Sequence, residues 1–300
     1  MIGPRFLRNK SKINSFTLIS NSDEMKKITD ISELKEIARK IRVDVIKMTN
    51  AAGSGHPGGA LSSAEIFSVL YFNIMNHDPK NPCWDNRDVF ILSKGHSCPA
   101  MYSSLAKSGY FPIEELMTLR KLGSRLQGHP HFGCLKCVEA STGSLGQGLS
   151  IAVGVALAQK LDKRNSRVYC LMGDGEQQEG QIWEAAMCAT HYKTDNLCGV
   201  IDRNRLQIDG FTKDVMNYEP LEDKWKAFGW HVINVDGHDI PELISAFEKA
   251  KKIKGKPTVI IADTVKGKGV AFMENVAIWH GQAPNDEEMK KALNDLGELH

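Results

Sequence analysis

The chain has 300 residues, with 38 Lys and Arg against 36 Asp and Glu, so its formal net charge is only +2. This balance argues against a nucleic-acid-binding protein, and no apolar run approaches the roughly 18 residues that a membrane span needs. The length allows one large α/β domain or two small ones, and we favour a single domain over residues 24–300.

The amino-terminal segment differs from the rest in composition. Four basic residues and no acidic one precede Asp23, which superficially resembles an organellar transit peptide. No clear amphipathic pattern is present, so we interpret residues 1–23 as a poorly ordered leader. Seven cysteines at irregular spacing, without a secretory segment, favour a reducing, cytoplasmic location.

The first predicted helix begins after Asp30 and ends near Gly53. Asp30 with Glu33 resembles a capping box, and apolar residues follow at helical spacing. Residues 53–59 are rich in glycine and predict a loop, after which residues 62–75 resume a helical pattern.

Apolar runs and helical patterns then alternate along the chain. The predicted strands are residues 89–92, 167–172, 197–201, 232–235 and 258–262. The predicted helices are residues 98–107, 149–161, 177–191, 241–252 and 286–299. This alternation indicates an α/β protein with a doubly wound, mostly parallel sheet flanked by helices, and ligands at the carboxyl ends of its strands.

A turn between the predicted strand 167–172 and the helix after it has the composition of a phosphate site. The turn consists of Gly173, Asp174, Gly175 and Glu176. Glycines let the backbone approach a ligand, and free N–H groups at a helix start favour an anion. Asn204 follows the next strand. The oxygens of Asp174, Asn204 and the Leu206 carbonyl, completed by phosphate and water, would make an octahedral Mg²⁺ site or a looser Ca²⁺ site.

Four histidines lie next to a glycine in predicted loops, namely His56, His96, His129 and His280. Taken singly, each is typical of a loop histidine with ordinary hydrogen bonds. Taken together with a diphosphate site, they predict imidazoles that bind phosphate and sugar hydroxyls or transfer protons near neutral pH.

Two glutamates, Glu179 and Glu184, lie five residues apart on the helix predicted after Asp174. One interpretation is a solvated helix face. The other is a buried acid–base relay, because a buried carboxylate needs a proton or a partner. We favour the relay because of the site beside it.

These residues resemble the amino-terminal half of transketolase, the thiamine-diphosphate enzyme that moves two-carbon ketol units between sugar phosphates. The resemblance extends from about residue 30 to His280 and includes seven motifs in the order of the family. They are Gly55-His56-Pro57-Gly58, Ser93-Lys94-Gly95-His96, Gly128-His129-Pro130, Thr142-Gly143-Ser144-Leu145-Gly146-Gln147-Gly148, Gly173-Asp174-Gly175 with Glu179-Gly180, Asn204 with Gln207-Ile208-Asp209-Gly210, and His280-Gly281. The resemblance implies a thiamine-diphosphate-binding fold.

The resemblance also implies roles for individual positions. The implied metal ligands are Asp174, Asn204 and the carbonyl of Leu206. The implied cofactor-binding residues are His96, Gly143, Leu145, Gly173, Asp174, Gly175, Glu176, Asn204, Ile208 and His280. The implied catalytic residues are His56, His96, His129 and His280 in the substrate channel, with Glu179 and Glu184 in a carboxylate network at a subunit interface.

The sequence departs from whole transketolases at its end. Those enzymes continue into a second domain, which supplies the glutamate that activates the aminopyrimidine and most arginines that hold the sugar phosphate. The sequence ends at His300, so we expect these groups to come from another chain. We therefore expect the amino-terminal subunit of a split transketolase, with a separate carboxy-terminal chain, self-association in an α2β2-like assembly, and sugar phosphate substrates.

Three alternatives remain open at this point. The first is another thiamine-diphosphate enzyme, similar to deoxyxylulose-phosphate synthase or to the α subunit of an oxo-acid dehydrogenase; the His56-Pro57 pair, His129 and Glu179 argue against it. The second is a non-catalytic partner subunit, which would be expected to have lost metal or histidine positions, and none of these is missing. The third is a nicotinamide dehydrogenase, but the sequence lacks the G-x-G-x-x-G turn that this class needs after its first strand.

Overall fold

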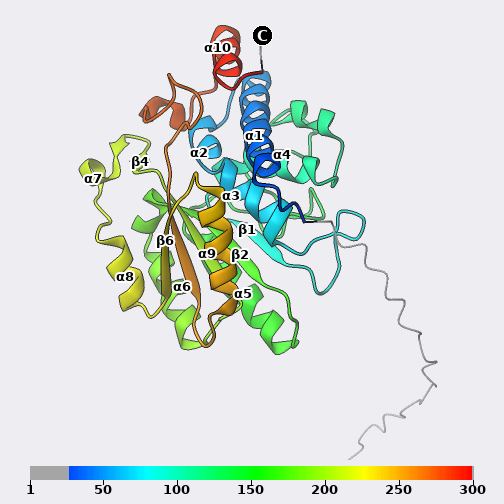
Figure 1. Ribbon diagram of the computed structural model, residues 1–300. Helices are drawn as coiled ribbons and strands as arrows, with labels where there is room; N and C mark the ends of the chain where they lie inside the picture. The colour runs from blue at the N-terminus through cyan, green and yellow to red at the C-terminus, as the bar shows by residue number, and fades with distance from the viewer. Residues whose placement is uncertain (1–26, 299–300) are drawn as a thin grey trace, which may run out of the picture.

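The computed structural model describes residues 27–298 and has a parallel sheet at its centre (Figure 1). The leader predicted for residues 1–23 lies outside the described residues. The strands of the main sheet are β1 (Val89–Leu92), β2 (Val168–Gly173), β3 (Leu197–Arg203), β6 (His231–Asp236) and β7 (Thr258–Asp263). They lie in the order β1-β2-β3-β7-β6, and every neighbouring pair is parallel. All five predicted strands are confirmed, each to within two residues.

The sheet has helices on both faces. Alternate residues of β2 point to opposite sides, so Tyr169 packs with α1 (Ile31–Ala52), α3 (Ala64–Val69), α4 (Cys98–Lys107) and α9 (Ile240–Lys252). Cys170 packs in a second cluster with α5 (Gln147–Leu161), α6 (Gly180–His191) and α8 (Leu221–Ala227). Figure 1 shows α9 in front of the strands. Because both faces are covered, β2 is apolar from Val168 to Met172 and β3 from Leu197 to Ile201.

The strand order places a crevice between β3 and β7. The chain leaves β3 for α8 on one face and enters β7 from α9 on the other, so two neighbouring strands have their connections on opposite sides. In open α/β sheets such a switch point leaves a crevice at the carboxyl ends of the strands, where ligands bind. The segments that follow β3 and β7 therefore flank the expected binding position.

The first helix ends where its caps predict. The side chain of Asp30 accepts a hydrogen bond from the N–H of Ser32 at 2.8 Å, and Gly53 closes α1 with φ +59°. Asp30 therefore caps the helix through the N–H of Ser32. A capping box would instead use the N–H of Glu33. The predicted helices 98–107 and 241–252 are also confirmed, as α4 and α9.

One loop prediction and one helix prediction need correction. The loop predicted for residues 53–59 ends early, because α2 (Pro57–Ser62) begins at Pro57, a residue that suits the first helical position. The single helix predicted for residues 62–75 is divided into α2, α3 and a π-helical turn, Leu70–Ile74. A Cβ on Gly58 would lie 2.8 Å from the carbonyl oxygen of Trp279, so this glycine lets α2 pack beneath a distant loop.

The remaining elements are short or terminal. They are β4 (Leu206–Gln207) paired with β5 (Gly210–Phe211), α7 (Thr212–Val215), α10 (Asp286–Asp295), and 3₁₀ turns at Gly95–Ser97, Ile113–Thr118, Gly175–Gln178 and Ala277–His280. The predicted terminal helix is α10, which has a full capping box at Asn285 but ends at Asp295. No helix within residues 27–298 is long and apolar enough to cross a membrane.

Candidate active site

A cavity of about 330 Å³ opens at the carboxyl edge of the sheet. Loops after β1, β2, β3 and β7 meet there with the loops that carry the four histidines. The predicted site residues in its lining are His56, His96, His129, Gly143, Leu145, Gly173, Asp174, Gly175, Glu176, Glu179, Asn204, Leu206, Ile208 and His280. Glu184 is the one predicted residue outside the lining. The fold thus brings together side chains from seven separate stretches of the chain.

The four histidines form one cluster. The ring of His56 lies 5.4 Å from that of His96, 6.0 Å from that of His129 and 5.7 Å from that of His280, measured between centroids. Burial, followed by nearby cations, lowers the pKa of His56 to about 4 and that of His280 to about 3. Burial also lowers the pKa of His96 and of His129. All four imidazoles are therefore neutral at pH 7.

A buried lysine that we did not predict joins this cluster to the crevice. The ammonium group of Lys266 lies 2.7 Å from Nδ1 of His280 and 2.8 Å from the carbonyl oxygen of Leu206. Lysine can only donate, so both atoms accept. The carbonyl oxygen of Leu206, a predicted metal ligand, therefore faces a position that holds a cation, which here is the ammonium group of Lys266.

Asp174 is buried with little to balance its charge. One carboxylate oxygen accepts from the N–H of Gly175 at 2.7 Å, and the other accepts from the N–H of Arg205 and from the hydroxyl of Tyr218. Burial and then the nearby Asp202 carboxylate raise the pKa of Asp174 to about 6. A bound cation would relieve this cost.

The predicted metal ligands form a suitable donor set. Asp174 supplies a carboxylate, Asn204 an amide oxygen and Leu206 a carbonyl, and hard oxygens of this kind suit Mg²⁺ or Ca²⁺. The amide oxygen of Asn204 also accepts from the N–H of Leu206 at 3.1 Å, which fixes its direction. Within residues 27–298, no group of three His, Cys, Asp or Glu side chains offers a second metal site.

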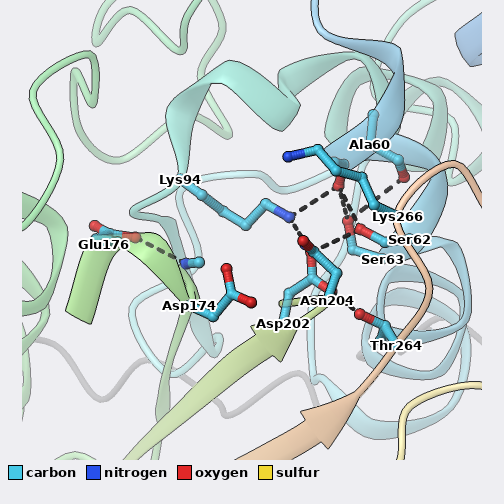
Figure 2. Close-up of polar contacts among 12 residues, drawn as sticks. Ala60, Ser62, Ser63, Lys94, Asp174, Glu176, Asp202, Asn204, Thr264 and Lys266 are labelled. Carbon is cyan, nitrogen blue, oxygen red and sulfur yellow. Dashed lines mark hydrogen bonds and ion pairs between the residues drawn. The ribbon is translucent and has the colours of Figure 1, made fainter. Parts of the chain in front are cut away.

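Lys94, which lines the cavity, forms an ion pair with Asp202 (Figure 2). Their side chains are only 2% and 0% exposed. Asp202 also accepts from the amide nitrogen of Asn204 at 3.2 Å, so the pair orients a predicted metal ligand. The remaining partners of the pair are the carbonyl of Gly59 and the hydroxyls of Ser62 and Thr264.

Glu176 lines the cavity, but its carboxylate is engaged by the protein. One oxygen accepts from the hydroxyl of Ser93 and from the N–H of Gly146 at 2.8 Å. The other accepts from the N–H of Gly173 at 2.9 Å. Glu176 therefore ties three loops together, and a direct contact with a cofactor stays a prediction.

Both glutamates predicted for a relay are exposed in the single chain. The helix predicted from residue 177 is interrupted, because Glu179 has an extended backbone, ψ 128°, between the 3₁₀ turn and α6. Glu179 faces the cavity and Glu184 lies on α6. The expected burial is thus wrong for this chain alone, and a role for both at a subunit interface stays a prediction.

Glycines allow the loops of the site to pack closely. A Cβ on Gly95 would lie 1.5 Å from the carbonyl oxygen of Thr142, and one on Gly148 would lie 2.4 Å from the hydroxyl of Ser93. The loop after β1 and the loop before α5 can therefore touch only because these positions carry no side chain.

Comparison with known proteins identifies the family to which this chain belongs. Residues 33–299 match the family described as "Transketolase, thiamine diphosphate binding domain". The chain is 46% identical over 267 residues to the 6-deoxy-6-sulfo-D-fructose transketolase subunit of Clostridium sp. (strain MSTE9), covering 89% of this chain and 96% of that protein. It is 42% identical over 268 residues to an apulose-4-phosphate transketolase subunit of Phocaeicola vulgatus, covering 89% and 95%.

Solved structures agree with these matches. Transketolase from Campylobacter jejuni superposes with a TM-score of 0.84 at 39% identity, and the alignment covers 90% of this chain but 43% of that enzyme. The chain belongs to the transketolase family and contains its thiamine-diphosphate-binding domain. The predicted family and fold class are confirmed, and the matches to subunits support the predicted amino-terminal subunit.

Proposed function

We propose that this chain, together with a separate carboxy-terminal subunit, transfers a two-carbon ketol unit from a ketose phosphate to an aldose phosphate. The observation that carries the proposal is the cavity at the carboxyl edge, where four neutral histidines and three hard oxygen donors converge. The relatives named as transketolase subunits, which this chain matches over almost their whole length, support a division between two chains.

The cofactor of the proposal is thiamine diphosphate with Mg²⁺ or Ca²⁺. When bound, thiamine diphosphate supplies the electron sink for breaking the bond beside a ketose carbonyl. Asp174, Asn204 and the carbonyl of Leu206 would hold the cation that neutralises the diphosphate. The N–H groups of the Gly175 turn, with His96 and His280, would surround the phosphate oxygens.

The histidines act on the sugar in this proposal. Their low pKa values keep them neutral, so they offer hydrogen bonds to hydroxyl and developing alkoxide oxygens without binding the substrate as fixed charges. Because the cluster is largely buried, these hydrogen bonds form where water competes little.

The proposed partner covers the mouth of the cavity. Three large apolar side chains in segments that border it are mostly exposed, namely Ile208 at 66%, Met216 at 61% and Ile278 at 59%. Exposed apolar side chains around a cavity are consistent with an interface there. We propose an α2β2-like assembly whose interfaces also cover Glu179 and Glu184.

We propose a cytoplasmic location, which the seven free cysteines support.

The test is ketol transfer with Mg²⁺ and thiamine diphosphate, by this chain alone and mixed with a candidate carboxy-terminal chain. Xylulose 5-phosphate is the first donor and ribose 5-phosphate the first acceptor; the sulfo sugar and the apulose phosphate in the names of the relatives come next. Activity in the mixture alone is expected. Activity of this chain alone would overturn the two-subunit proposal. Transfer only to pyruvate would favour a synthase, and silence with every donor would overturn ketol transfer.

A further inference from the structure

Arg120 points at the histidine cluster without a carboxylate partner. Its guanidinium donates to the hydroxyl of Ser54 at 2.9 Å, to the carbonyl oxygen of Gly128 at 3.3 Å and to Nδ1 of His56 at 3.3 Å. Within residues 27–298, no carboxylate oxygen lies within 4.0 Å of the group. This partly buried arginine, bonded only to neutral acceptors, places a positive charge beside the cavity that no carboxylate balances.

The contact with His56 determines where the imidazole carries its proton. A guanidinium has five N–H donors and no acceptor, so Nδ1 of His56 must present a lone pair. In the neutral ring the proton is then on Nε2. The Nε2 atom has no hydrogen-bond partner in the described part of the chain, and the ring lines the cavity. A Cβ placed on Gly281 would lie 3.7 Å from Nε2.

We propose that Arg120 is the positioning residue of His56 and holds it as the tautomer that carries its proton on Nε2. His56 thereby offers a hydrogen-bond donor to an oxygen of the sugar and does not act as a base. The role for the sugar rests on the proposed function, whereas the tautomer does not. Arg120 itself contacts neither substrate nor cofactor in this proposal.

The backbone around Arg120 is unusual in two respects. Arg120 has φ +59°, a left-handed conformation that costs a non-glycine residue of order 1 kcal/mol or more. A Cβ on Gly128 would lie 2.8 Å from the guanidinium carbon, so an alanine there would displace this group from its present position.

The electrostatics agree with the geometry. Burial and then the charge of Arg120 lower the pKa of His56 to about 4. An imidazolium would also direct its Nδ1–H against an N–H of the guanidinium. The groups that face His56 are Arg120, Lys266, His96, His129 and His280. None is acidic, so nothing in this set favours the protonated ring.

The experiment reads the tautomer directly. The full chain is labelled with ¹⁵N-histidine, and two-bond ¹H–¹⁵N spectra are recorded from pH 5.5 to 9 without cofactor or sugar. His56→Gln assigns the resonances. Arg120→Met removes the donor, and Gly128→Ala displaces the guanidinium while the arginine stays. Arg125→Met is the matched control, because it removes a cation from the same segment that pairs with Glu115 at 2.7 Å.

In the unmodified chain and in Arg125→Met, we expect one His56 tautomer, protonated on Nε2, over the whole pH range. In Arg120→Met and Gly128→Ala, the Nδ1–H tautomer is expected to appear and the pKa of His56 to rise by roughly one unit or more. A proton on Nδ1 in the unmodified chain, or spectra that neither variant changes, would overturn the inference. Failure of ketol transfer would instead overturn the proposed function, since the spectra need no turnover.

Discussion

Replacing Lys94 with methionine is expected to destabilise the fold by about 3–5 kcal/mol, because it leaves a buried carboxylate without its counter-charge. Lys94 and Asp202 are 2% and 0% exposed, so water cannot take over from the lost ammonium. Methionine retains most of the length of the side chain, so the loss is mainly electrostatic. The hydroxyls of Ser62 and Thr264 still donate to Asp202, which favours the lower end of the range.

The assay is urea unfolding followed by tryptophan fluorescence and by far-UV circular dichroism. At about 3 kcal/mol per molar urea, a loss of about 3–5 kcal/mol lowers the midpoint by about 1–1.7 M. Coincident curves from the two probes are needed before these values are converted to free energies. Asp202→Asn alone and Lys94→Met with Asp202→Asn complete a double-mutant cycle.

The cycle separates an ion pair from two independent side chains. We expect the double variant to recover about 2 kcal/mol or more of the summed losses, since removing both charges leaves neither unpaired. The reasoning is refuted if Lys94→Met lowers the midpoint by less than about 0.3 M, or if the two losses simply add.

Three further predictions concern the site and its supports. Asp174→Ala in the assembled complex is expected to weaken Mg²⁺ and thiamine diphosphate binding at least about tenfold by calorimetry; unchanged affinities would contradict the metal assignment. Gly95→Ala is expected to lower the free energy of unfolding by about 3 kcal/mol in thermal unfolding, because its Cβ would lie 1.5 Å from a backbone oxygen. Gly154→Ala on α5 is the control: its Cβ would have nothing within 4 Å, and it should stabilise slightly. Burial acts to raise the pKa of Glu65, but Arg42 lowers it to about 2. This carboxylate therefore contributes up to about 3 kcal/mol to the free energy of unfolding above pH 4.5, and that contribution is lost as the pH falls toward 2. Glu65→Gln should flatten the dependence of the unfolding free energy on pH between these values. An unchanged slope would exclude the contribution of Glu65.

The sheet and most of the site could be predicted from local patterns. The apolar run of β2 is continuous because helices cover both faces of its strand, and Gly53 at the end of α1 marks its own helix terminus. Candidate site residues were predicted where polar groups follow such strands, and Asp174 and Asn204, which follow β2 and β3, do line the cavity. These features depend on neighbours in the sequence, so they are visible in it.

Features that depend on distant segments were missed. The predicted helix is interrupted at Glu179, close to Glu176, whose carboxylate accepts a hydrogen bond from the N–H of Gly146, thirty residues before Glu176. No helical pattern in the sequence contains that contact. Lys94 and Lys266 were overlooked as site residues because lysine is rarely buried without a partner. Their partners become apparent only when the sheet aligns the strand ends, although each lysine follows a strand within three residues.

Glu176 makes three loops behave as one rigid body. Its carboxylate joins the end of β1, the end of β2 and the loop before α5, so none of these loops can shift without breaking a buried hydrogen bond. The proposed phosphate-binding turn is thus held in place by the protein itself, and we expect ordering it to cost little entropy on binding. A change at Ser93, which follows β1 whereas the turn follows β2, is then expected to weaken cofactor affinity by loosening the turn.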